Sequence, residues 1–224
     1  MNSRIETTVR ALQYYAGALW RWLGMLILVW LAAGCSPSSP DNQQDICQIF
    51  RQQPRWYDYA KAAEVKWGTS IATQMAFIQF ESSFYSHIRP PGQTLFGLFT
   101  WDRPSSAYGY AQAQNPAWRD YLNDGASPLA RRTHMRYATD FIGWYNQRSH
   151  HRVNIALDNP THLYLAYHEG LTGYERGRYQ NKPHVLHTAR QVGTQARLFA
   201  HQLAQCEYEF VCDGFYQIGP FCRK

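Results

Sequence analysis

Glu81 is the residue whose sequence surroundings most favour chemistry. It follows the apolar run Ile78-Gln79-Phe80 and precedes two serines and Phe84. A carboxylate loses hydration where water is scarce, so burial raises its pKa and keeps it protonated near neutral pH. A protonated carboxylic acid can act as a general acid, which cleavage of a glycosidic bond requires. The alternative is an exposed glutamate at the end of a helix, and this short segment leaves both open.

Two later segments carry polar and aromatic residues that could join Glu81. The first is Gly109-Tyr110-Ala111-Gln112, after a stretch rich in Pro and Gly. The second is Ala166-Tyr167-His168-Glu169-Gly170, at the end of a helical pattern. Glu169 is a candidate for the second carboxylate that ordinary glycosidases use. Its alternatives are a hydrogen-bonded support of the site and a surface residue.

The order of these segments resembles the soluble lytic transglycosylase (SLT) family, which has the goose-type lysozyme-like fold. That family shows a Glu-Ser, then Gly-Leu-Met-Gln, then Ala-Tyr-Asn-Ala/Gly-Gly. Glu81-Ser82 and the two later segments occupy these places over about residues 46–206. Tyr110-Ala111 replaces Leu-Met, and His168-Glu169 replaces Asn-Ala. The interval between the first two motifs is also long. The whole pattern resembles a divergent, lipoprotein branch of the family.

The resemblance implies that Glu81 is the single catalytic acid/base of a peptidoglycan lytic transglycosylase. Glu81 would protonate the oxygen between N-acetylmuramic acid (MurNAc) and N-acetylglucosamine (GlcNAc). It would then take the proton of the muramoyl C6 hydroxyl, which attacks C1 and leaves a 1,6-anhydro end. The alternatives are a hydrolytic muramidase that uses Glu169 and a non-catalytic peptidoglycan-binding lipoprotein.

The resemblance also places Tyr167 and Gln112 at the substrate, although a core aromatic and a loop-stabilising amide are the alternatives. Ser82 could instead bond Glu81 or cap local backbone. No His pair has the HExxH arrangement, so we expect neither a metal nor a cofactor. The full set of expected substrate contacts is Ser82, Tyr108, Tyr110, Gln112, Tyr167, His168 and Glu169.

The elements that must position these residues are helical. Apolar periodicity predicts helices from Asp45 to Gly68, from Ser70 to Glu81, over about 128–149, from Asp158 to near Gly170, and over 183–206. Asn115-Pro116 is typical of a cap and a first helical residue. Residues 86–109 are rich in Pro and Gly and predict a long loop, which in a compact domain is usually functional. We therefore expect a mainly α domain over 45–224, lysozyme-like by the resemblance.

The N-terminus predicts a lipoprotein signal peptide over residues 1–34. Three arginines precede the apolar stretch 23–31, small residues follow, and Cys35 comes next. The apolar run is shorter than the roughly 20 residues that span a bilayer. Leu31–Cys35 resembles a lipobox with its leucine one position early, so Cys35 is the expected lipidation site. Residues 35–44 would be a flexible tether, and Ser36 favours the outer membrane, with the domain on the periplasmic face.

Cysteine usage and charge agree with export. Cys47, Cys206, Cys212 and Cys222 allow two disulfides, of which we favour Cys47–Cys206 and Cys212–Cys222, the second closing the C-terminal segment. A zinc site is disfavoured because there is no CxxC. The net charge is +6, and it is 19 − 15 = +4 without residues 1–34, a modest positive balance that suits an anionic cell-wall polymer or lipid headgroups. Without Lys/Arg runs, nucleic acid is not an expected partner, and we expect a monomer.

Overall fold

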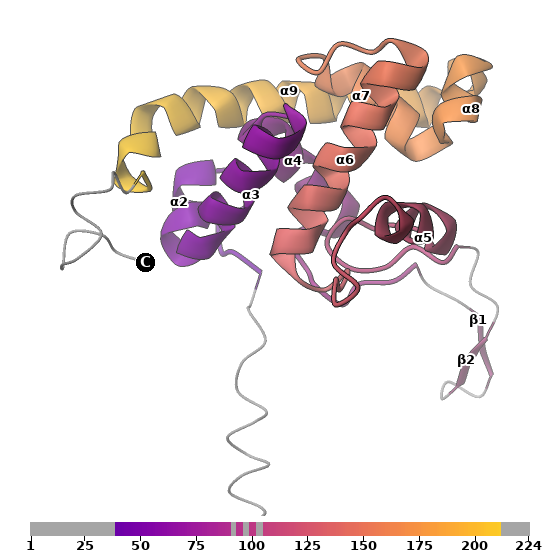
Figure 1. The fold of residues 1–224 in the computed structure, drawn as a ribbon, viewed down its shortest axis with the longest axis horizontal. Coiled ribbons are helices and arrows are strands. Elements are labelled where there is room, and N and C mark those ends of the chain that lie inside the picture. Colours follow the sequence, from indigo (N-terminus) through magenta and orange to yellow (C-terminus); the bar gives the residue numbers. More distant parts are fainter. Residues whose placement is uncertain (1–38, 91–92, 96–98, 102–104, 212–224) are drawn as a thin grey trace, which may run out of the picture. The chain divides into compact units, whose positions relative to one another are not determined.

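The computed structural model describes residues 39–90, 93–95, 99–101 and 105–211, and these form the mainly helical domain that the sequence predicts (Figure 1). Among these residues, no helix combines the length and the apolar character needed to cross a bilayer. The elements are α2 Ile46–Gln52, α3 Pro54–Trp67, α4 Ile71–Ser82, β1 Gln93–Leu95, β2 Phe99–Trp101, α5 Asn115–Asn123, α6 Met135–Val153, α7 Pro160–Glu169, α8 Leu171–Glu175, the 3-10 turn η1 Arg178–Asn181, α9 Pro183–Cys206 and the 3-10 turn η2 Glu207–Glu209.

Helix α4 is the centre of the core. Every residue from Ile71 to Gln79 is buried, so other elements enclose this mostly apolar helix on all sides. It packs against α9, α6 and α3, and α9 runs along both α4 and α7 (Figure 1). The Ser70 side chain caps its first turn by accepting the Thr73 N–H at 3.2 Å. Glu81 is the penultimate residue of this helix.

The chain reverses sharply after α4. Ser83 and Phe84 both have positive φ, of 50° and 61°, a region that residues with a side chain seldom adopt. Phe84 is fully buried and stacks on Trp56 of α3 at 5.8 Å between ring centroids. Burial of this ring offsets the backbone strain and fixes where α4 stops.

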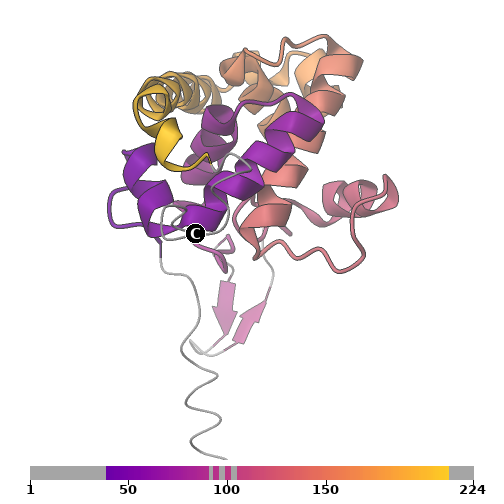
Figure 2. The ribbon, with the colours of Figure 1, turned by 60° about the vertical axis from the view of Figure 1, so that its left-hand side comes forward.

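A disulfide joins the first and last long helical segments of the domain. Cys47 of α2 and Cys206 of α9 are bonded, with S–S 2.08 Å, as the sequence analysis favoured. Figure 2 views α9 (yellow) nearly along its axis, with its end beside the indigo α2. The second expected pair, Cys212–Cys222, lies outside the described residues.

The described part of the expected tether is not free. The Ser39 hydroxyl and the Gln43 amide both donate to the carbonyl oxygen of Ser83, at 2.8 and 3.0 Å. The Gln79 amide donates to the carbonyl oxygen of Gln43 at 2.8 Å, and Pro40 is buried. The segment 39–44 is therefore seated against the end of α4. The rest of the tether, with Cys35, lies outside the described residues.

Three other predictions need correction. Helix α6 begins at Met135, not near residue 128, because His134 caps it and the preceding residues turn toward Gly109. Helix α5 begins at Asn115, with Gln114 at the N-cap position but without a side-chain cap bond, and the Asn115 side chain accepts from Arg132 at 2.6 Å. The loop 86–109 contains a short antiparallel hairpin, β1 paired with β2.

Candidate active site

Glu81 lies in a cleft of about 580 Å³ between the end of α4, the segment 105–117 and helices α6 and α7. The segment 109–112 and helix α7 carry the two later motifs, so the fold brings all three motifs to one place. The cleft also holds Tyr145 of α6. Its full lining is Glu81, Pro90, Ser105, Ala107, Gln112, Gln114, Pro116, Ala117, Tyr145, Tyr167, His168, Glu169 and Gly170.

The surroundings of Glu81 favour its protonated form. Burial raises the pKa of its carboxyl to about 7, and the Tyr164 hydroxyl, which bonds to the carboxylate, only partly opposes that effect. Its place in the last turn of α4 acts in the same direction, because the C-terminal end of a helix carries partial negative charge. Both protonation states of the carboxyl are therefore accessible near neutral pH, and the same group can release and regain a proton there.

Tyr164 and Tyr167 form an aromatic wall behind the carboxyl. Both rings meet Phe77 edge-on, at 5.2 and 5.4 Å between centroids. Burial and the charge of Glu81 raise the pKa of both phenols, so both stay neutral donors. The Tyr167 hydroxyl donates to the carbonyl oxygen of Ala111, which ties α7 to the second motif. Tyr167 thus lines the cleft and also fixes its opposite wall.

Gln112 is held by its backbone and by its amide. Its φ of 45° turns the chain, and its side-chain nitrogen donates to the carbonyl oxygens of Ile88 and Gly109, at 3.0 and 2.8 Å. Both N–H groups of the amide are therefore engaged. Gln112 can offer a ligand in the cleft only its amide oxygen.

Glu169 lies in the same cleft, but it is ion-paired. Its side chain is 3 % exposed, and the ammonium of Lys182 bonds both of its oxygens at 2.9 Å. Burial acts to raise its pKa, but Lys182 and His168 outweigh burial and hold the pKa below its usual value. The two carboxyls of the cleft are thus driven in opposite directions, Glu81 toward the acid and Glu169 toward the paired anion.

Of the remaining expected contacts, His168 lines the cleft, whereas Tyr110, Ser82 and Tyr108 do not. Tyr110 is 1 % exposed and packs on Trp56 at 5.6 Å, so it is a core residue and not a surface for substrate. Ser82 is buried, and its hydroxyl donates to the carbonyl oxygen of Ile78 at 3.1 Å, the local backbone bond that was one of its alternatives. Tyr108 lines a neighbouring pocket.

Sequence reasoning missed Tyr164, Tyr145 and Lys182. Tyr164 lies three residues before Tyr167 and so shares its helix face, a spacing that could have revealed it. Tyr145 donates to the carbonyl oxygen of Ala166 at 3.3 Å, a contact with no sequence signal. Within the described residues, no group of three or more His, Cys, Asp or Glu side chains is arranged to hold a metal ion.

Comparison with known protein families gives one result. The family model described as "Transglycosylase SLT domain" matches residues 23–206, which includes the whole cleft and starts upstream of the helical domain. Comparison with curated proteins and with solved structures gives no match.

Proposed function

The chain belongs to the transglycosylase SLT domain family, and from that premise we propose that it cleaves the MurNAc-β-1,4-GlcNAc bond of peptidoglycan and forms 1,6-anhydroMurNAc, with Glu81 as the only acid/base. The observation that carries the proposal is the pKa of Glu81, raised to about 7 in a cleft beside an ion-paired second carboxylate.

The first step uses the acid form of Glu81. Its proton passes to the glycosidic oxygen as the bond to muramoyl C1 breaks, and GlcNAc leaves with a free O4 hydroxyl. Glu81 is then a carboxylate, and the neutral hydroxyl of Tyr164 is placed to stabilise it by a hydrogen bond.

The second step uses the base form. The carboxylate takes the proton of the muramoyl C6 hydroxyl as that oxygen bonds to C1. Glu81 is acid again, and no water has been consumed. A residue with a pKa near the working pH suits both steps, since neither protonation state is scarce.

The state of Glu169 favours this route over hydrolysis. A hydrolytic mechanism needs a second carboxylate free to activate water or attack the sugar. Glu169 has both oxygens bonded to Lys182. That pairing supports a structural role at the cleft.

Product analysis tests the proposal. Purified murein is incubated with the wild-type protein and with Glu81→Gln, and soluble products are weighed by mass spectrometry. We expect muropeptides lacking one water per cut from the wild type and none from the variant. Intact reducing ends would indicate hydrolysis, and no products from the folded, oxidised wild type would indicate a binding protein.

We also propose that the chain is a lipoprotein, anchored through Cys35 on the periplasmic side of the envelope, with the outer membrane favoured by Ser36. The Cys47–Cys206 disulfide supports an oxidising compartment. Metabolic fatty-acid labelling of the wild type and of Cys35→Ala tests this. Equal labelling of both proteins would exclude Cys35 as the acceptor.

A further inference from the structure

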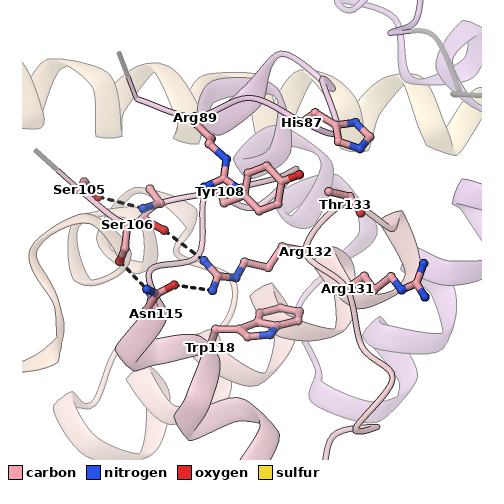
Figure 3. Close-up of a pocket in the computed structure, with 11 residues that line it drawn as sticks. His87, Arg89, Ser105, Ser106, Tyr108, Asn115, Trp118, Arg131, Arg132 and Thr133 are labelled. Carbon is pink, nitrogen blue, oxygen red and sulfur yellow. Dashed lines mark hydrogen bonds between the residues drawn. The ribbon is translucent and has the colours of Figure 1, made fainter. Parts of the chain in front are cut away.

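A second pocket, of about 480 Å³, adjoins the cleft (Figure 3). The two share Ser105 and Ala107 in their linings. Three arginines reach this pocket, Arg89 from the chain after α4 and Arg131 and Arg132 from the turn before α6. Its other lining residues are His87, Ser106, Tyr108, Asn115, Trp118 and Thr133, so no acidic residue is among the described residues that line it.

The positive charge of this pocket is not neutralised within the described part of the chain. The ion pairs there involve other residues, and none includes Arg89, Arg131 or Arg132. Burial, and then the charge of Arg89, lower the pKa of Arg132, as expected where cations crowd together. A pocket that gathers cations without a counter-ion favours an anionic ligand.

The guanidinium groups of Arg132 and Arg89 are held in place. Arg132 donates to the carbonyl oxygens of Ser106 and Ala113, at 3.1 and 2.9 Å, and to the Asn115 side chain at 2.6 Å. Three of its five N–H groups are thus used, and two remain for a ligand. The guanidinium of Arg89 lies 3.9 Å from the ring centre of Tyr108, and Figure 3 shows the two stacked at the edge of the pocket.

We propose that this pocket binds a carboxylate of the peptide attached to the muramoyl residue, while Glu81 acts on the glycan next to it. The inference rests on the proposed function. The sugar rings of the strand carry no charge, so they give the three arginines nothing to pair with. The attached peptide does carry free carboxylates, which guanidinium groups bind through paired hydrogen bonds.

A double variant, Arg89→Gln with Arg131→Gln, tests the proposal and leaves Arg132 in place to hold the loop. The control is Arg190→Gln, an exposed arginine of α9 outside the pocket. Each protein is assayed on peptide-bearing strands and on the same strands after their free peptide carboxyls have been amidated. We expect the ratio of kcat/KM for the two substrates to fall about tenfold in the double variant, the loss of one or two charge-assisted contacts. The control should keep the wild-type ratio, and an unchanged ratio in the double variant would overturn the proposal.

A binding measurement separates this subsite from the proposed reaction. The free peptide is titrated calorimetrically into Glu81→Gln with the pocket arginines intact or replaced, at low and high KCl. We expect tighter binding with intact arginines, lost on raising the salt and on amidating the peptide carboxyls. This result would support the subsite even if the wild type cleaved neither substrate. Equal affinity for the amidated and the free peptide would refute it.

Discussion

Replacing Glu81 by Gln should stabilise the protein at alkaline pH. The pKa of Glu81 is raised to about 7 in the folded chain, whereas an unfolded Glu titrates near 4.3. A raised pKa means that the folded state binds the proton more tightly, so this stabilisation is complete below about pH 4 and is lost as pH rises through 7. At 1.36 kcal/mol per pKa unit, the ionised carboxylate lowers the free energy of unfolding by about 3–4 kcal/mol above pH 8.

The assay is urea unfolding of the oxidised protein, followed by tryptophan fluorescence at pH 4 and pH 8.5. Glutamine has the size of glutamate but never ionises, so the variant does not lose unfolding free energy as the pH rises. The difference in unfolding free energy, variant minus wild type, should be about 3–4 kcal/mol larger at pH 8.5 than at pH 4. If the difference is the same at both values, Glu81 ionises like an exposed glutamate, and the argument for its role as an acid fails.

Glu169 provides a control, because its effect on the free energy of unfolding should change with pH in the opposite direction to that of Glu81. Its pKa is held low by Lys182 and His168, so its stabilisation is present above the unfolded pKa and is lost as pH falls. Glu169→Gln should therefore weaken the protein more at pH 8.5 than at pH 4. Parallel trends for both variants would show a general effect of removing charge and not the two separate environments.

Three further outcomes follow from the same contacts. Tyr164→Phe removes a hydrogen bond that lowers the pKa of Glu81. The alkaline limb of the pH profile of murein cleavage, expected near pH 7 for the wild type, should therefore move to higher pH. A move to lower pH would contradict this. Gly109→Ala places a Cβ 2.2 Å from the carbonyl oxygen of Arg132, at a φ of +79°. We expect a loss of about 2 kcal/mol or more in the free energy of unfolding, together with reduced cleavage. Melting and turnover equal to those of the wild type would refute this. Replacing Cys47 and Cys206 by Ser should cost about 2–5 kcal/mol in chemical unfolding, and wild-type protein treated with a reductant should match the variant.

Local chemistry predicted the elements well where the signal lies in neighbouring residues. The cap at Ser70, the left-handed stop at Gly68 and the span 183–206 all follow from caps and periodicity. Helix α6 begins later than predicted because the carbonyl oxygen of Arg132 accepts the N–H of Tyr110 at 3.2 Å, a contact between distant segments.

At the site, too, motifs of neighbouring residues were predictive, whereas contacts between distant segments were not. The motif order predicted that Glu81, Gln112 and Tyr167 share one site, and the structure places all three in one cleft. Motif position could not reveal that Tyr110 points into the core, since burial depends on Trp56 of another helix. Nor could it supply the partner of Glu169, because Lys182 lies beyond two intervening elements.

The seating of residues 39–44 makes the ends of α4 and α2 the places where mechanical load enters the domain. Going inward from residue 39, the Ser39 hydroxyl bonds the carbonyl oxygen of Ser83, Asp41 then bonds Gln52 at the end of α2, and the Gln43 amide bonds Ser83 again. A pull on the chain from its N-terminal side would therefore act on the turn directly after Glu81 and, through Asp41, on the end of α2. Because Cys47 lies in α2, the load would be shared between the turn beside the acid of the cleft and the helix that carries the disulfide.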